Sequence, residues 1–404
     1  ATNTVFKVTS NSGTADFFYI KGDGKVGIGT TVPNEKLTVS GNISASGIVY
    51  ADAFNSVTGG STIDFNDSVD LAGNITLTGY LSANGGYCSD ANSNSKFGTS
   101  ALNGLTSGTH NTATGMAALY TNTTGIKNTA SGNYALRLNT TGCCNTAYGY
   151  NASYSNTTGS VNVAVGHQSL NSNTTASYNT AVGGCALYAN TTGAGNTASG
   201  TYALRDNTTA SYNTAFGYRA LVANTTAANN AAVGYYALQG NTTGASNTAI
   251  GGNSLKSNTT ASQNTAFGGC TLYANTTGAN NTGVGFKALV ANTCGKENVA
   301  VGSGALCATT SGCKNTALGT YALRTNTTGC SNTASGYTVL YSNTTGYYNN
   351  GSGHASLYTN TTGNSNNAIG NHSLFKNTTG CYNVALGRAA LYENTTANFN
   401  TAVG

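Results

Sequence analysis

The sequence contains little charge, a single proline and no tryptophan. Charged residues make up 7% of its 404 residues, and no run of 18 apolar residues is present that could cross a membrane as a helix. Low charge and 54 glycines are compatible with disorder, but 25 tyrosines and 11 phenylalanines exceed what disordered chains usually carry. The composition therefore predicts an ordered protein that does not insert into a membrane.

The net charge of +5 is divided unevenly along the chain. Residues 1–93 carry four lysines against eight acidic residues, whereas residues 94–404 carry twelve Lys or Arg against Asp206, Glu297 and Glu393. The positive charge of the second part is spread thinly and forms no basic run with interleaved aromatics, the pattern typical of nucleic-acid binding. We therefore expect no nucleic-acid partner.

From Asn94 onward the chain repeats one 17-residue phrase, N-T-A-x-G-x-x-A-L-x-x-N-T-T-G-x-x, whose positions are called slots 1 to 17. Eighteen copies follow one another without an insertion, and a nineteenth begins at Asn400. The chain stops five residues into that copy, so we expect it to be part of a longer protein or filament. An unbroken period of this length is typical of a solenoid.

Seventeen residues are too few for a helix pair but suit one coil of a parallel β-solenoid, with two or three short strands joined by tight turns. Neighbouring coils would be stacked about 4.8 Å apart, so equivalent slots would form ladders. We expect an all-β fold: a solenoid of about eighteen coils over residues 94–404, preceded by a small β-rich module over residues 1–93. A short helical turn at A-L-x-x-N in each coil remains an alternative.

Invariant slots indicate what the coil requires. Slot 5 is Gly in every copy, which predicts a positive φ or a close backbone approach. Slot 15 is Ala in five copies, so we expect that this corner does not need a positive φ. Slot 9 is Leu in seventeen of eighteen copies, and slots 3 and 8 are mostly small, which predicts a thin core that chains could share by associating. Asparagines at slots 1 and 12 predict two ladders of hydrogen-bonded amides.

Residues 1–93 show alternating apolar and polar residues punctuated by Gly and Asn, typical of short strands and hairpins. Gly22, Gly24 and Gly27 have the spacing of a dinucleotide-binding loop, but the following VGIGTTVP reads as strand and turn, so we expect a hairpin. Residues 64–70, DFNDSVD, offer oxygen ligands for Ca²⁺, although a solvated loop is the favoured interpretation. We expect no cofactor and no metal.

Fifteen copies read N-T-T at slots 12–14, which is formally an N-glycosylation signal. The alternative is that these residues serve ladder hydrogen bonding, which we favour for a bacterial or phage protein. The candidate glycosylation sites are Asn122, Asn139, Asn156, Asn173, Asn190, Asn207, Asn224, Asn241, Asn258, Asn275, Asn326, Asn343, Asn360, Asn377 and Asn394.

Slot 10 carries a recurring tyrosine that could stack on sugar rings. The alternatives are packing between subunits and ordinary wall surface. The candidate carbohydrate-contact residues are Tyr120, Tyr154, Tyr188, Tyr273, Tyr341, Tyr358 and Tyr392.

Residues suited to catalysis are few in the repeat region. Glycoside hydrolysis needs a pair of carboxylates, and the three acidic residues of this region are far apart along the coils. A pair of carboxylates could then be assembled only at an interface between subunits. Cys313 and Cys330 occupy slot 16 of successive coils, a spacing that would allow a disulfide, but no zinc-binding spacing recurs. We expect no catalytic residues and no enzymatic activity.

The segment GKVGIGTTVPNEKLTVSGNISASG at residues 24–47 resembles one common in phage tail-fibre and related bacterial surface proteins. The NTAVG…AL…NTTG copies look like repeats of the same proteins and are loosely similar to the head repeats of trimeric autotransporter adhesins, which form left-handed parallel β-rolls. The resemblance implies a structural fibre that is extracellular, on a cell surface or on a virion, and that forms a homotrimer or a helical homopolymer. An alternative is a receptor fibre that binds surface carbohydrate through the Tyr-bearing face.

Overall fold

A computed structural model describes residues 4–9, 16–30, 32, 36–39, 88–89 and 92–404. The chain divides into two compact units, Ala1–Thr76 and Leu77–Gly404, and each is described by itself. Every element within the described residues is a β-strand, which confirms the all-β fold predicted from the sequence. Among these residues no helix is long and apolar enough to cross a membrane.

The first unit contains a small sheet in the order β1-β2-β3-β4. Strands β1 (Thr4–Thr9), β2 (Asp16–Lys21) and β3 (Val26–Ile28) pair antiparallel, and β4 (Leu37–Val39) joins β3 in parallel. The side chain of Tyr19 on β2 is buried.

The turn between β2 and β3 contains the glycine motif and is a hairpin, as expected. Gly24 has a φ of +84° and donates its backbone N–H to the Lys21 carbonyl at 2.9 Å. The Lys21 ammonium lies 3.4 Å from the Asp23 carboxylate, across the same turn. The oxygen-rich segment at residues 64–70 lies outside the described residues.

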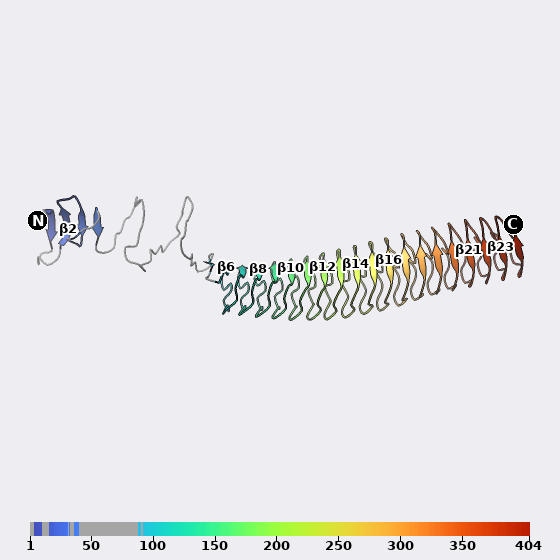
Figure 1. Cartoon of the computed structure of the whole chain (residues 1–404), viewed down its shortest axis with the longest axis horizontal. Helices are drawn as coiled ribbons and strands as arrows, with labels where there is room; N and C mark the ends of the chain where they lie inside the picture. Colours follow the sequence, from blue (N-terminus) through green and yellow to red (C-terminus); the bar gives the residue numbers. More distant parts are fainter. Residues whose placement is uncertain (1–3, 10–15, 31, 33–35, 40–87, 90–91) are drawn as a thin grey trace. The chain divides into compact units, whose positions relative to one another are not determined.

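The second unit is a parallel β-solenoid, with one three-residue strand in each coil at slots 2–4 (Figure 1). A short strand, β5, pairs antiparallel with β6 and precedes the predicted start of the repeats at residue 94. The strands are β5 Cys88–Ser89, β6 Ser95–Phe97, β7 Thr112–Thr114, β8 Thr129–Ser131, β9 Thr146–Tyr148, β10 Val163–Val165, β11 Thr180–Val182, β12 Thr197–Ser199, β13 Thr214–Phe216, β14 Ala231–Val233, β15 Thr248–Ile250, β16 Thr265–Phe267, β17 Thr282–Val284, β18 Val299–Val301, β19 Thr316–Leu318, β20 Thr333–Ser335, β21 Asn350–Ser352, β22 Asn367–Ile369, β23 Val384–Leu386 and β24 Thr401–Val403.

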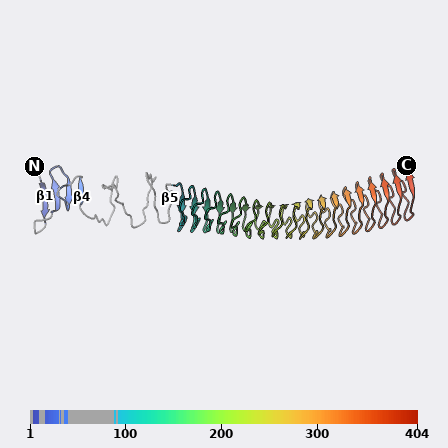
Figure 2. The ribbon, with the colours of Figure 1, turned by 60° about the horizontal axis from the view of Figure 1, so that its bottom comes forward.

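From β6 to β24 each strand pairs with its successor in chain order, and each residue lies beside its counterpart 17 positions later, as Ala181 lies beside Ala198. Figure 2 shows the coils stacked in this order from a second direction. The prediction of two or three strands per coil is wrong, because only slots 2–4 are extended. The alternative of a helical turn at A-L-x-x-N is also wrong: this stretch is a series of non-helical turns.

The interior of each coil has an apolar half, which is formed by the side chains of slots 3, 8 and 9. In the coil that begins at residue 179 these are Ala181, Ala186 and Leu187, all fully buried. Equivalent residues stack into continuous Ala and Leu ladders along the solenoid. The expected ladders are confirmed, and one chain buries these side chains completely, so the core does not need to be shared between chains.

The other half of the interior is polar and consists of two asparagine ladders, as predicted. At slot 12, the Asn207 side-chain amide donates to Asn190 Oδ1 at 2.8 Å and to the Ala210 carbonyl at 2.9 Å. At slot 1, Asn196 donates its backbone N–H to Asn179 Oδ1 and its side-chain amide to the same Ala210 carbonyl, both at 2.9 Å. The slot-15 carbonyl thus joins the two ladders.

The turns explain the invariant glycine of slot 5. Gly217 has a φ of +128°, and a Cβ placed on it would lie 2.6 Å from the carbonyl oxygen of Gly234 in the next coil. Both the backbone conformation and the close approach exclude a side chain. The slot-15 glycines are not in the positive-φ region, which confirms that this corner has no such requirement.

Residues other than glycine also adopt positive φ, at slots 7, 9 and 17, which was not predicted. Arg219 and Leu221, at slots 7 and 9, have φ of 55° and 54°. Arg219 donates its N–H backward to the Thr201 carbonyl, and Leu221 donates forward to the Ala237 carbonyl. The left-handed residues therefore let one turn form hydrogen bonds with both neighbouring coils, which offsets their conformational cost of about 1–2 kcal/mol each.

Candidate functional site

The fifteen asparagines of the N-T-T motifs lie in the slot-12 ladder. Fourteen of them are fully buried, and the last, Asn394, is half-buried. Their Nδ2 atoms, where a glycan would be attached, donate hydrogen bonds inside the coil. The geometry of the folded solenoid therefore favours the hydrogen-bonding role over glycosylation at Asn122, Asn139, Asn156, Asn173, Asn190, Asn207, Asn224, Asn241, Asn258, Asn275, Asn326, Asn343, Asn360 and Asn377.

The slot-10 tyrosines are half-buried on a wall formed by slots 6, 7 and 10, here called the turn wall. Near the C-terminal end, Tyr341, Tyr358, Phe375 and Tyr392 form one stack with ring centroids 5.1–5.2 Å apart and planes within 14° of parallel. In such a stack each ring covers the face of the next, and ring faces are what a bound sugar would contact. This geometry favours a packing role for these tyrosines.

Other slot-10 tyrosines lie beside cations. Tyr120 and Tyr154 flank Arg137, whose guanidinium carbon is 5.5 and 5.6 Å from the two ring centroids. Arg137 Nη1 also donates a hydrogen bond to the Tyr154 hydroxyl at 2.7 Å. The Tyr273 ring lies 5.5 Å from the Lys256 ammonium. Tyr188, the remaining candidate, occupies the same slot in the column.

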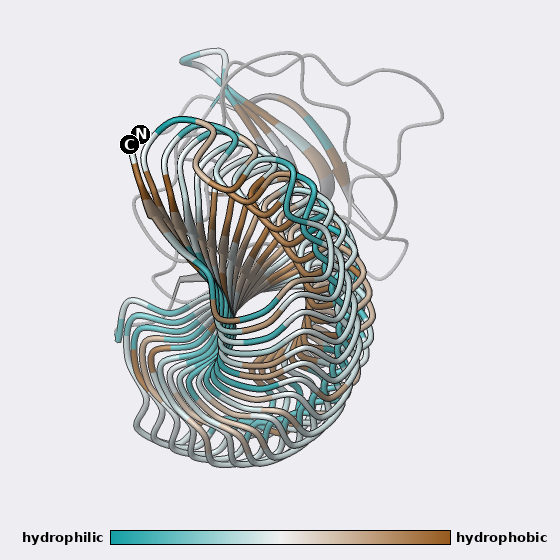
Figure 3. Cartoon of the chain, turned by 90° about the vertical axis from the view of Figure 1, so that its right-hand side faces the viewer, coloured by the Kyte–Doolittle hydropathy of each residue, from teal (hydrophilic) through white to brown (hydrophobic). Residues whose placement is uncertain are grey.

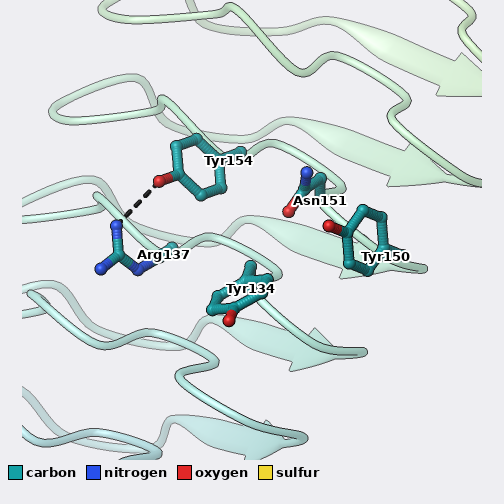
Figure 4. A pocket seen from close by; sticks show the side chains of 5 residues that line it. All are labelled: Tyr134, Arg137, Tyr150, Asn151 and Tyr154. Carbon is teal, nitrogen blue, oxygen red and sulfur yellow. Dashed lines mark hydrogen bonds between the residues drawn. The ribbon is translucent and has the colours of Figure 1, made fainter.

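A pocket of about 320 Å³ opens on the turn wall around Arg137 (Figure 4). It is lined by Tyr134, Arg137, Tyr150, Asn151 and Tyr154, which come from two successive coils. Tyr134 and Tyr150 meet edge to face, with centroids 6.1 Å apart. The sequence predicted only Tyr154 of these residues, because the other four occupy slots whose residue type changes from coil to coil.

The pocket has unusual polar atoms. Arg137 Nε and Asn151 Oδ1 are both buried and have no hydrogen-bond partner among the described residues. Buried polar atoms are paired in the great majority of cases, so these two atoms are exceptions. Each exposes less than 1 Å², so a bound polar group would reach them only after a shift of the neighbouring side chains. The set offers a positive charge, a hydrogen-bond acceptor and three tyrosine rings, which fit a small anionic molecule that also carries hydroxyl groups.

Three other cations, at slots 10 and 11, are paired. Arg205 binds Asp206 through two hydrogen bonds of 2.7 and 2.8 Å, and this contact raises the pKa of Arg205. A hydrogen bond to the Tyr341 hydroxyl raises the pKa of Arg324 in the same direction. Lys376 pairs with Glu393 at 2.8 Å. Arg137 differs from these three residues in keeping an unpaired donor, and Arg219 Nε on the same wall is likewise buried and without a hydrogen-bond partner.

Cysteines and acidic residues form no second site in the described part of the chain. Cys313 and Cys330 are both free thiols: Cys313 donates its backbone N–H to Cys330 Sγ at 3.1 Å, and the disulfide that their spacing would allow is not formed. Within the same residues no three His, Cys, Asp or Glu side chains lie close enough to hold a metal ion.

No protein-family model matches this chain, and no curated protein matches it.

Proposed function

We propose that this chain is a structural subunit of a fibre that is extracellular, on a cell surface or on a virion, that associates with copies of itself, and that is not an enzyme. The observation that supports this most is the uninterrupted stack of parallel strands from β6 to β24 (Figure 1). With coils about 4.8 Å apart, the solenoid is about 85 Å long. A repeat whose outward residues vary while its buried residues stay the same is suited to a mechanical role.

The hydrogen bonding supports the stiffness that such a role needs. Each coil donates backbone hydrogen bonds to both neighbours, and two amide ladders and a Leu ladder run through the interior. Bending the rod would stretch several of these contacts at every coil. The location and the fibre assembly are supported by the resemblance of residues 24–47 to fibre proteins.

The assembly can be tested on the purified full chain by analytical ultracentrifugation and negative-stain microscopy. We expect elongated particles that contain more than one chain. A monodisperse monomer at micromolar concentration would contradict the proposed self-association.

A second candidate function is carbohydrate binding through the turn wall, and the pocket around Arg137 favours it. The unpaired Arg137 Nε is a donor for a carboxylate, Asn151 Oδ1 can accept from a sugar hydroxyl, and Tyr150 presents an exposed ring. These groups fit a sugar that carries an acid group better than a neutral sugar. The stacked tyrosines near the C-terminal end cover one another's ring faces and therefore support this candidate less.

Calorimetric titration with an acidic oligosaccharide and its neutral counterpart would test the second candidate. We expect binding of the acidic sugar that falls at least tenfold in Arg137→Gln, while Arg388→Gln, at an exposed turn-wall position, leaves it unchanged. Equal binding of both sugars, or no effect of Arg137→Gln, would exclude the Arg137 pocket as the site.

A further inference from the structure

The outward face of the long sheet, made of slots 2 and 4 and here called the sheet face, has an uncommon composition. None of its residues in β6 to β24 is charged. Slot 2 is mostly threonine, and slot 4 is mostly a large apolar residue. The large apolar side chains exposed at slot 4 are Phe97, Tyr148, Val165, Val182, Phe216, Val233, Phe267, Val284, Val301, Leu318, Ile369 and Val403.

Most other outward slots of the solenoid accept charge. Every Lys, Arg, Asp and Glu of residues 94–404 lies at slot 3, 6, 7, 10, 11, 16 or 17, and the charge at slot 3 is Lys96 in the first coil. Slots 13 and 14 are also uncharged, but they carry mainly threonine, and the slot-13 hydroxyls are used in bonds between coils, as Thr208 Oγ1 donates to the Thr225 carbonyl. The sheet face is therefore the surface that is both uncharged and apolar.

We propose that the sheet face is the surface through which this chain associates with a second copy of itself; this inference rests on the self-association put forward under the proposed function. Large apolar side chains occupy fourteen of the nineteen slot-4 positions in β6 to β24, and the row is interrupted at Thr114, Ser131, Ser199, Ser335 and Ser352. The longest unbroken run covers seven successive coils, from Phe216 to Leu318, and an exposed apolar surface of this extent is typical of an interaction site.

The repeat geometry favours a second copy over an unrelated partner. The slot-4 side chains recur once per coil, about every 4.8 Å, so a partner with the same spacing can interdigitate with all of them. The sheet also twists along the rod, so that its strands fan out in the end-on view of Figure 3. Only a partner with the same spacing and twist can wind with this row over many coils, and another copy meets both conditions.

Charge favours the same arrangement. The described solenoid carries twelve basic residues against three acidic ones, so two copies repel each other where cations meet. Contact through the sheet face brings no Lys, Arg, Asp or Glu side chains of slots 2 and 4 together. The charged turn wall and its pocket can then remain open on the outside of the pair.

The area available is sufficient for a stable pair. A strip about 85 Å long and three residues, or about 10 Å, wide corresponds to about 850 Å² on each copy. Two copies that wind together along the whole strip would bury about 1,700 Å², close to the size of a standard specific interface.

The experiment compares assembly of the full chain and of variants by analytical ultracentrifugation. The first variant replaces Val182, Val233 and Val284 by lysine, and the second replaces the same residues by serine, a residue that Ser199 shows to be compatible with slot 4 in this fold. The control variant places lysine at three exposed slot-17 positions: Tyr178→Lys, Tyr212→Lys and Tyr382→Lys. Circular dichroism checks that each variant is folded.

We expect the lysine variant to weaken association at least a hundredfold, the serine variant at least fivefold, and the control not at all. If the lysine variant does not fold, the serine variant decides. If both slot-4 variants associate as strongly as the wild-type chain, the sheet face is not the interface, and the proposed fibre function is unaffected. A monomeric wild-type chain would overturn the fibre function itself, and equal loss in the control variant would also reject the sheet face.

Discussion

The buried and the outward slots of the coil follow opposite rules. Slots 1, 3, 8, 9 and 12 scarcely change over eighteen coils, because each side chain packs on its own counterparts above and below. Slot 5 is always glycine, because its backbone lies against that of the next coil. Slots 6, 7 and 10 change from coil to coil and carry most of the cations and aromatic rings. The difference separates residues that maintain the solenoid from residues whose chemistry is local to a few coils.

Slot 4 fits neither rule, and this exception supports the sheet face as an interface. It points outward, as Val182 and Val233 do with exposed fractions of 38% each, yet it excludes charge like a buried slot. An outward position constrained in this way is expected where another surface covers it. The predictions below test the buried slots first and the outward ones afterwards.

The largest effect is expected from Gly217→Ala. The substitution combines a φ of +128° with a Cβ that would meet the Gly234 carbonyl, so we expect a loss of about 4 kcal/mol in local stability. Hydrogen exchange of the neighbouring coils would measure it, since stability in a repeat array is local. Gly252→Ala is the control, because its Cβ would meet no atom within 4 Å; an equal loss there would refute the explanation.

Leu221→Ala should cost about 3 kcal/mol, because it leaves a cavity in the Leu ladder at a fully buried site. The midpoint of unfolding in guanidinium chloride and hydrogen exchange in the adjoining coils would measure this loss of stability. The control is Val233→Ala at the exposed slot-4 position, which should lower stability by well under half as much as Leu221→Ala. Similar losses at both positions would mean that the interior ladder is not the main core.

Asn224→Ala should cost about 2 kcal/mol. Its Nδ2 donates to Asn207 Oδ1 and to the Ala227 carbonyl, both at 2.9 Å. Removal leaves the buried Asn207 Oδ1 unpaired, whereas the Ala227 carbonyl keeps the hydrogen bond from the Asn213 amide. Asn103→Ala, at an exposed slot-10 position, is the matched control and should change the midpoint little. Tolerance of Asn224→Ala would show that the amide ladder contributes little to stability.

Tyr358→Ala should cost about 1 kcal/mol, because it interrupts the stack between Tyr341 and Phe375. Thermal unfolding followed by near-ultraviolet circular dichroism would detect both the loss and the altered tyrosine signal. A change in sugar binding without a change in stability would instead support a carbohydrate role for this tyrosine.

The smallest expected effect is that of pH. The buried ladders contain amides, hydroxyls and aliphatic groups, none of which binds or releases a proton between pH 5 and 8, so they contribute no difference in bound protons between the folded and unfolded chain. The unfolding temperature should therefore be nearly constant across this range. A shift of more than a few degrees would point to ionisable groups as a major source of stability.

The residues of the candidate pocket were harder to anticipate than the fold. Tyr154 was predicted from its recurring slot, whereas Arg137 and Asn151 occupy slots that hold many residue types, so no pattern marked them. Their meeting depends on the stacking of two particular coils, which brings residues 14 positions apart to one pocket. For the slot-12 asparagines the opposite holds: their N-T-T motif is a recognisable glycosylation signal, but the structure places these side chains inside the coil.

The amino-acid sequence alone determined the period, the solenoid class and the identities of the buried ladders, because a residue that stacks on itself must recur at one slot. Only the tertiary structure decided that each coil has a single strand, that Leu221 and its equivalents adopt positive φ, and that one chain closes its own core. The reason is that backbone direction in the turns depends on hydrogen bonds to the coils before and after. Those partners are absent from the local sequence of any one coil.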